Sequence, residues 1–234
     1  MKLYYDLHIH SALSPCGDND MTPNNIVNMS IIKGLDMIAV TDHNSCGNVR
    51  AVMEAAGDRI LVIPGMEVET SEEVHVVCYF PDIESAEKMG EYVKEHMPGV
   101  KNQEEIFGEQ LYMDSEDNII GKEENLLVTA TDLDIFEVVK KVRELGGAAV
   151  PAHIDRSSYS VLSNLGFMPP ELLVETVEIT AKNRLKMEEE YGKKYNIISD
   201  SDAHYLEDIH EPEFSVNLMS KSAKKLIEYL CKME

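Results

Sequence analysis

The chain has 234 residues, of which 44% are hydrophobic, and this is enough to build one sizeable core. It carries 43 acidic and 21 basic side chains, which give a formal net charge of -22 at pH 7. Proteins bind long polyanions mainly through Lys and Arg, so this charge balance disfavours long nucleic acid as a partner. We therefore expect one domain, residues 1–234, that acts on a small molecule. The sequence does not indicate an oligomeric state.

Cysteine usage and hydropathy indicate the compartment. The four cysteines form neither a CxxC pair nor a dense framework, which is typical of a reducing environment. The first residues, MKLYYDLHIH, lack the basic and apolar regions of a secretory signal, and no apolar run approaches the length of a membrane span. We predict a cytoplasmic protein with no membrane partner.

Strand-like and helix-like segments alternate along the chain. A strand over residues 2–8 precedes a helix over 23–33, for which Thr22 is a candidate N-cap and Pro23 the first residue. The same pattern predicts strands over 35–41, 59–69, 74–80, 148–153, 176–180 and 196–202, and helices over 48–57, 84–95, 133–145 and 222–233. Strands separated by helices predict a parallel sheet, and this many units in one domain predict an α/β barrel.

Residues 99–132 interrupt the alternation. Apolar pairs flank the turn-rich sequence DSEDN, so we expect a β-hairpin excursion around residues 108–122. The hairpin could be a lid over a site or an association surface, and the sequence does not decide between these roles.

Candidate metal ligands fall where the predicted strands end. Six of the eight histidines lie in short clusters with acidic partners, whereas His96 and His210 stand outside such clusters and are expected at the surface. The clustered candidates are His8, His10, His43, Glu67, His75, His153, Asp202 and His204. Most of them lie at or just past the C-terminal end of a predicted strand, the face where α/β barrels place their active sites.

This donor set predicts two or three divalent transition metal ions. Neutral imidazoles and carboxylates are ligands that Zn, Fe and Mn accept, and the donor types do not distinguish between these metals. Such a site can activate water and bind a phosphoryl group. An HxH pair alone would be weak evidence, and His75, in the middle of its predicted strand, could instead be a histidine of the core.

The motifs carry a family resemblance. DLHIHS, TDH, GMEVE, the downstream His75, AHID and SDAH occur in this order, and together they resemble the motifs of the PHP (polymerase and histidinol phosphatase) family. The resemblance implies a distorted seven-stranded α/β barrel, (βα)7, with up to three metal ions. It covers almost the whole chain.

The resemblance also implies a ligand assignment. One ion would be held by His8, His10, Glu67 and Asp202, and a second by His43 and His204. Glu67 would bridge to a third ion held by His75 and His153.

The chain departs from the family pattern at one ligand. Family members usually have a further Asp or His five or six residues after the HxH motif, where this chain has Pro15 and Cys16. Cys16 could bind as a thiolate, or the loop could bring in Asp18 or Asp20. We favour Asp18 slightly.

The predicted activity is hydrolysis of a small phosphate ester, a phosphomonoester or a mononucleotide, by attack of a metal-bound hydroxide. Arg156 could bind the substrate phosphate or form a surface ion pair, and Arg184 is a weaker candidate for the same task. If the second ion is absent, His43 or His204 could transfer a proton. Asp6 and Asp42 could orient neighbouring imidazoles or stabilise turns. Two alternatives are a nuclease or nucleotide phosphodiesterase acting on short oligonucleotides, and a non-catalytic metal-binding regulatory domain.

Overall fold

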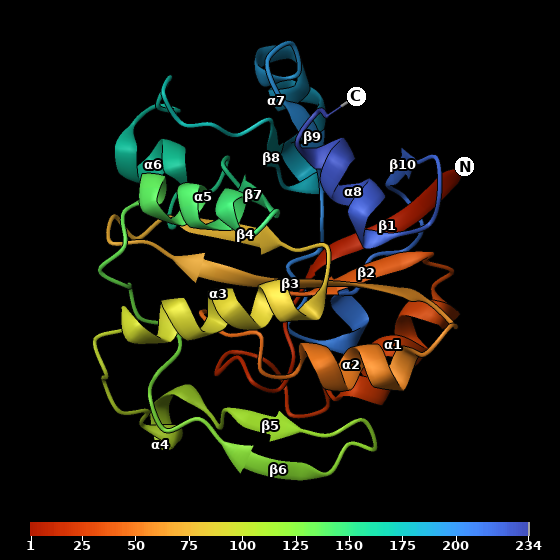
Figure 1. Cartoon of the computed structure of the whole chain (residues 1–234), viewed down its shortest axis with the longest axis vertical. Helices are drawn as coiled ribbons and strands as arrows, with labels where there is room; N and C mark the ends of the chain where they lie inside the picture. Colours follow the sequence, from red (N-terminus) through yellow and green to blue (C-terminus); the bar gives the residue numbers. More distant parts are fainter. Residues whose placement is uncertain (234) are drawn as a thin grey trace.

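The computed structural model describes residues 1–233, and its centre is a curled six-stranded sheet (Figure 1). In spatial order the strands are β10 (Ser215–Asn217), β1 (Lys2–Ile9), β2 (Met37–Val40), β3 (Leu61–Glu69), β4 (His75–Tyr79) and β7 (Ala148–Pro151). A separate parallel pair is formed by β8 (Thr176–Glu178) and β9 (Asn196–Ile198). The α/β class is as predicted.

The sheet is mixed rather than parallel, which corrects the prediction of an all-parallel barrel. β1, β2 and β3 are parallel to one another, but β4 is antiparallel to both of its neighbours, and β10 is antiparallel to β1. The connection between β3 and β4 spans only residues 70–74, and a parallel pairing would need a crossover of a dozen or more residues. The expected count of seven strand–helix units is not confirmed.

Helices cover the sheet where the sequence pattern predicts them. Thr22 caps the first of them, its hydroxyl accepting a hydrogen bond from the backbone N–H of Asn25, and Asp134 and Glu137 form a capping box on another. The helices that match predictions are α1 (Pro23–Ile32), α2 (Val49–Ala56), α3 (Ile83–Glu95), α5 (Ile135–Glu144) and α8 (Ala223–Leu230). The unpredicted helices are α4 (Glu104–Phe107), α6 (Val161–Leu165), α7 (Arg184–Tyr191) and the 3-10 turns η1 (Ala181–Asn183) and η2 (Leu206–Asp208).

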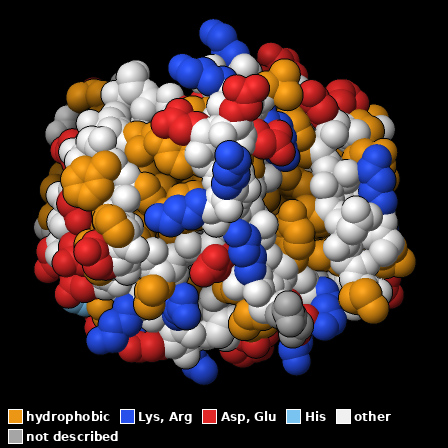
Figure 2. All heavy atoms as spheres, turned by 90° about the horizontal axis from the view of Figure 1, so that it is seen from above, with side chains coloured by type: hydrophobic (Ala, Val, Ile, Leu, Met, Phe, Trp, Pro, Cys, Tyr) orange, Lys and Arg blue, Asp and Glu red, His pale blue; other side chains and the backbone are white. Residues whose placement is uncertain are grey.

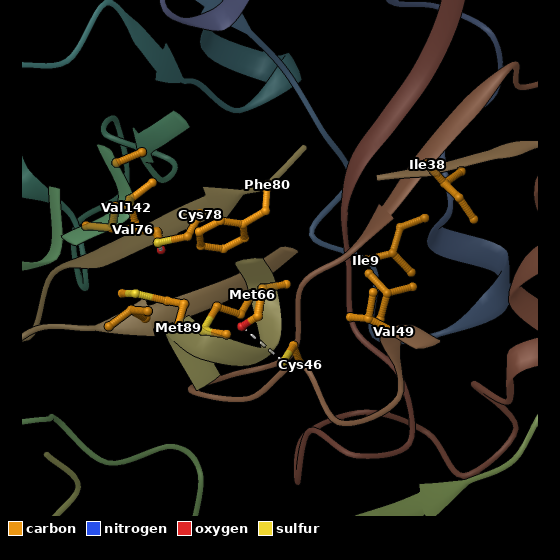
Figure 3. Packing of buried hydrophobic residues seen from close by; sticks show 14 of the residues in the cluster. Ile9, Ile38, Cys46, Val49, Met66, Val76, Cys78, Phe80, Met89 and Val142 are labelled. Atoms are coloured by element: carbon orange, nitrogen blue, oxygen red, sulfur yellow. Dashed lines mark hydrogen bonds between the residues drawn. The ribbon is translucent and has the colours of Figure 1, made fainter. Parts of the chain in front are cut away.

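Two hydrophobic clusters pack on opposite faces of the sheet. Successive side chains of a strand point to opposite faces, so Ile38 and Val40 enter one cluster and Met37 and Ala39 enter the other. Figure 3 shows part of the first cluster, where Phe80 packs with residues of β3, β4 and α5. Burial on both faces fixes the register of the strands and therefore the positions of the residues at their ends.

The segment around residues 108–122 contains two antiparallel strands, β5 (Leu111–Met113) and β6 (Ile119–Lys122), which lie apart from the main sheet (Figure 1). Asn48, at the start of α2, attaches them to the body of the protein. Its side-chain amide donates to the carbonyl of Leu111, and its Oδ1 accepts from the N–H of Met113. None of the described helices has the length and apolar character of a membrane span.

Candidate metal centre

The strand ends converge at one edge of the sheet. His8 and His10 lie at the end of β1, His43 follows β2, and Glu67 lies near the end of β3. Because β4 runs antiparallel to β3, its first residue, His75, lies at the same edge and pairs with Glu69. Two isolated bridges, His43 with Glu67 and Ile9 with Ala203, bring in the loops after β2 and β9.

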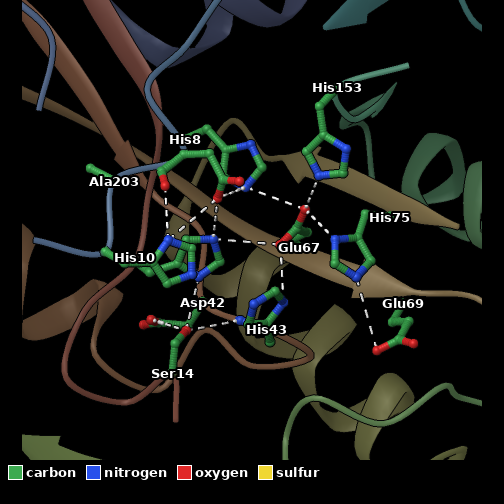
Figure 4. A network of polar contacts seen from close by, with 12 residues as sticks. His8, His10, Ser14, Asp42, His43, Glu67, Glu69, His75, His153 and Ala203 are labelled. Carbon is green, nitrogen blue, oxygen red and sulfur yellow. Dashed lines mark hydrogen bonds and ion pairs between the residues drawn. The ribbon is translucent and has the colours of Figure 1, made fainter. Parts of the chain in front are cut away.

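Glu67 lies at the centre of the cluster (Figure 4). Its Oε1 is 2.9 Å from His75 Nδ1 and 3.3 Å from both His8 Nε2 and His153 Nε2. Its Oε2 is 3.0 Å from His43 Nδ1 and 3.5 Å from His10 Nε2. One carboxylate therefore faces five imidazoles, two from the end of β1 and three from other segments of the chain.

Asp202 closes the cluster from the other side. Its Oδ1 lies 3.0 Å from His10 Nε2 and 3.4 Å from His8 Nε2, while its Oδ2 accepts a hydrogen bond of 2.5 Å from Arg156. Asp202 has φ +54, in the left-handed region, which Asp adopts more readily than most non-glycine residues. This conformation in the loop after β9 directs the carboxylate toward the histidines of the cluster.

Several buried donor atoms of the cluster lie close together without forming hydrogen bonds to one another. Although His8 Nε2, His43 Nδ1 and both oxygens of Glu67 are buried and close together, none makes a properly angled hydrogen bond to another described residue. Ligands bound at about 2.0–2.2 Å in a tetrahedron lie roughly 3.4 Å apart. The oxygens of Glu67 lie 3.3 to 3.5 Å from the nitrogens of His8, His10 and His153, close to that spacing, so the residues present fit a metal site.

Three groups of donors lie close enough to share an ion, with the donor atoms in each within 4.8 Å of one another. They are His8, His10, Glu67 and Asp202; His10, His43 and His204; and His43, Glu67 and His75. The first group matches the first set implied by the family resemblance. His153 lies outside the three groups but within 3.3 Å of Glu67 Oε1.

The electrostatics of the buried cluster favour ionised carboxylates. Burial opposes the charged form of Glu67, but the imidazoles of His75, His8 and His43 hold the pKa of this carboxyl well below its usual range. Burial likewise disfavours a charged His8, whereas the carboxylates of Glu178 and Glu67 raise its pKa well above the ordinary value. A cation can replace the protons that this arrangement otherwise holds.

Cys16 and Asp18, the candidates for the missing ligand, behave differently. Burial opposes a Cys16 thiolate, but hydrogen bonds from His204 and His43 lower the pKa of this thiol to about 7. The Oδ1 of Asp18 instead accepts from the backbone N–H of Asp20, within an exposed turn. Neither residue joins one of the three donor groups among the described residues, but only Cys16 faces the imidazoles.

Two supporting residues were missed at the level of sequence. The buried carboxylate of Glu178, at the end of β8, lies 2.8 Å from His8 Nδ1 and fixes the orientation of that imidazole. Ser14 lies 2.9 Å from His10 Nδ1 and donates its hydroxyl to Asp42, so Asp42 acts on an imidazole through this serine. The available signal was an acidic residue, Glu178, in the middle of the apolar strand predicted over 176–180.

The other candidates lie in varied surroundings. Arg156 lines a cavity of about 180 Å³ beside the donors, together with His43, His153 and His204. Arg184 lies elsewhere and donates to Ser199 and the carbonyl of Ile197, so it does not reach the cluster. Asp6 accepts backbone hydrogen bonds from residues 201 and 210 rather than orienting an imidazole.

The chain belongs to the PHP domain family, which its sequence matches over residues 6–231. This is a family of metal-dependent hydrolases and phosphoesterases. A relative described as an uncharacterized protein of Methanocaldococcus jannaschii is 27% identical over 192 residues, 81% of this chain. The 5'-3' exoribonuclease Rnm of Salmonella typhimurium is 32% identical over 85 residues, 34% of this chain. The present chain spans 21% and 28% of these relatives.

Solved structures share the fold at low sequence identity. The lesion-specific endonuclease EndoQ of Pyrococcus furiosus superimposes with a TM-score of 0.74 at 17% identity, covering all of this chain and 57% of that one. A putative metal-dependent phosphoesterase of Bifidobacterium adolescentis gives a TM-score of 0.60 at 16% identity, covering 96% of this chain and 95% of that one.

The expectation that no long nucleic acid is a partner is corrected by these comparisons. Endonuclease Q has also been solved in complex with a 27-mer duplex substrate whose abasic lesion lies at the active site, and that structure shares this fold with a TM-score of 0.72. Net charge is a sum over the whole surface, whereas bound cations reverse the local potential at a site. On the face that Figure 2 displays, Lys and Arg side chains are interspersed with acidic ones, so the negative charge of the chain is not spread evenly over its surface.

Proposed function

We propose that this protein is a metal-dependent nuclease that hydrolyses phosphodiester bonds of nucleic acid. The observation that carries the proposal is the buried carboxylate of Glu67 facing five imidazoles with unsatisfied donor and acceptor atoms beside an open cavity. Support for nucleic acid as the substrate comes from the exoribonuclease relative and the endonuclease fold.

The residues that would hold two or three Zn, Fe or Mn ions are His8, His10, His43, Glu67, His75, His153, Asp202 and His204. When bound, such ions lower the pKa of water and neutralise charge on a phosphoryl group. Glu67 suits a bridging role because its two oxygens face different histidines. Glu178 keeps His8 in the tautomer that presents Nε2 to the cluster.

Cys16 is our proposal for the ligand that the family pattern lacks. Its thiol faces His43 and His204, which form one donor group with His10. A soft sulfur ligand beside imidazoles would favour Zn over Mn at this position. Asp18 is the weaker candidate because its carboxylate is already engaged in its own turn.

Arg156 is placed to bind the substrate phosphate. Its guanidinium lines the cavity and is partly exposed, and Asp202 accepts from only one of its nitrogens. The remaining N–H groups can donate to a non-bridging phosphate oxygen. His204, whose side chain is also partly exposed, is positioned to move a proton if it carries no ion.

The test is a substrate panel with the metal-loaded protein. Single-stranded RNA, single-stranded DNA, duplex DNA with an abasic lesion and a phosphomonoester would be incubated with the protein, and the products resolved by length. The proposal predicts shortened oligonucleotides in at least one nucleic acid arm. Intact oligonucleotides in every arm, with or without phosphomonoester hydrolysis, would contradict it.

A further inference from the structure

Tyr159 lies at the mouth of the candidate metal centre. It lines the same cavity as Arg156 and His75, in the loop between β7 and α6. Its ring stacks on the imidazole of His75, with 4.9 Å between ring centroids and 25° between planes. The side of the molecule beyond Tyr159 is solvent, since the residue is 46% exposed.

The backbone holds Tyr159 in this position at an energetic cost. The carbonyl of Tyr159 accepts a hydrogen bond of 3.0 Å from the N–H of His75, and its φ is +53. A bulky residue in the left-handed region costs on the order of 1–3 kcal/mol, and such strain is concentrated at functional sites. Asn44, His153 and Asp202, which surround the same centre, also have positive φ.

The cavity lined by His75, Arg156 and Tyr159 is small. Its volume is about 180 Å³, whereas pockets that enclose a drug-sized ligand measure roughly 300–1,000 Å³. The space therefore admits a phosphate and a water but not a whole nucleotide. A nucleoside attached to that phosphate must extend over the rim, where the outer face of the Tyr159 ring is available.

We propose that Tyr159 is a stacking platform for a nucleobase next to the scissile phosphate, an inference that rests on the proposed nuclease function. One face of the ring is supported by His75 and the other receives the base. Stacking of a base on an aromatic side chain contributes roughly 1–3 kcal/mol and tolerates any base, because every base has a π face. Stacking on Tyr159 thus distinguishes a nucleotide that has a base from one that lacks it, but it does not distinguish one base from another.

The experiment compares an oligonucleotide that carries a base beside the cleaved bond with one that carries a reduced abasic residue there. For the wild-type protein, loss of the base should lower kcat/KM by about 5-fold to 150-fold, the equivalent of the stacking energy. Y159A should show little difference between the two oligonucleotides, because it has no platform to lose. Y159F should discriminate as the wild-type protein does. The proposal fails if Y159A retains the full discrimination.

A binding measurement separates this proposal from the nuclease proposal. Fluorescence of a 2-aminopurine base placed beside the phosphate would be titrated with protein in the presence of Zn²⁺. Quenching by wild type and Y159F but not by Y159A supports the platform, even if no bond is cleaved and the nuclease proposal falls. F167A is the matched control, because Phe167 is an exposed aromatic residue outside the cavity, and it should quench as wild type does. Equal quenching by all four proteins would overturn the proposal.

Discussion

Glu67 faces more of the candidate ligands than any other described residue does. Replacing it by Gln removes the negative charge that the surrounding imidazoles face and leaves the cluster without its central acid. Since loss of a residue that merely orients a ligand costs about 10-fold to 100-fold in metal affinity, we expect Glu67→Gln to cost at least about 100-fold. Elemental analysis after dialysis against buffered metal would measure this change.

The matched control for that substitution is Glu87→Gln. Glu87 pairs with Arg50 on the exposed surface of α3 and belongs to none of the donor groups found among the described residues. Its replacement should leave the metal content unchanged. Equal metal content in wild type, Glu67→Gln and Glu87→Gln would show that Glu67 is not a ligand.

Glu178 gives a second residue-scale prediction. Glu178→Gln keeps the size of the side chain but weakens its hold on His8 Nδ1, so the metal affinity should fall by about 10-fold to 100-fold. Competition with a chromogenic chelator would measure the affinity. Glu175→Gln, at an exposed position just before β8, should retain the wild-type affinity. A Glu178→Gln affinity equal to that of Glu175→Gln would argue against the positioning role.

The sequence was sufficient to find the candidate donors that the structure brings together, but not the residues behind them. The histidines and acids at the strand ends could be found because each belongs to a short motif, and the structure brings them together. Glu178 could not be paired with His8, because 170 positions separate them and contact depends on the placement of β8 beside β1. Tyr159 gave no signal, since its position follows from an unusual loop conformation.

At the scale of elements, Gly47 controls how the β5–β6 hairpin packs near the loop after β2. A Cβ at this position would lie 2.3 Å from the ring of Tyr112 and 2.9 Å from the side chain of Leu13. The hydroxyl of Tyr112 donates a hydrogen bond to the carboxylate of Glu123, which restrains the ring. An added methyl group at position 47 must therefore displace β5 and β6. We expect Gly47→Ala to lower the free energy of unfolding by about 1–3 kcal/mol in urea denaturation.

Gly121 provides the control on the hairpin itself. A Cβ there would lie 3.8 Å from the same Tyr112 ring, an ordinary contact, and the backbone conformation is open to any residue. Gly121→Ala should therefore unfold within about 0.5 kcal/mol of wild type, as surface substitutions usually do. If Gly47→Ala is as stable as Gly121→Ala, the packing described for the hairpin is incorrect.

Helices could be predicted where the apolar periodicity extends over many residues. The direction of a strand within the sheet could not be predicted. Helices such as α5 combine apolar periodicity with a capping box, so their positions follow from local sequence. The antiparallel direction of β4 depends on a five-residue connection, and it explains how His75, predicted in the middle of a strand, lies at the ligand edge instead. The three residues of β10 are too few to predict.

The whole molecule should be stabilised by its metals. Ions that bind only the folded state add about 2.7 kcal/mol when their concentration is 100 times Kd. For a domain of this size each kcal/mol shifts Tm by roughly 2–4 °C. We therefore expect chelation to lower Tm by about 5–10 °C in differential scanning calorimetry and re-addition of Zn²⁺ to restore it. An unchanged Tm would show that no ion is bound to the folded state.

At the scale of the whole molecule, net charge alone does not decide the class of partner. The value of -22 includes the buried carboxylates that face histidines in the centre, and these do not repel a polyanion once they hold cations. Total charge also contains no information about where basic and acidic side chains lie, and Figure 2 shows both kinds interspersed on one face. The distribution of charge depends on the fold, which composition does not contain.

The most direct test of the centre is anomalous X-ray diffraction from crystals of the metal-loaded protein. The structure predicts at least two anomalous peaks, with one or more at about 2.0–2.2 Å from the carboxylate oxygens of Glu67. The histidine nitrogens that face this carboxylate should complete the coordination. Absence of any peak near Glu67, with its oxygens hydrogen-bonded directly to the imidazoles, would contradict the metal centre.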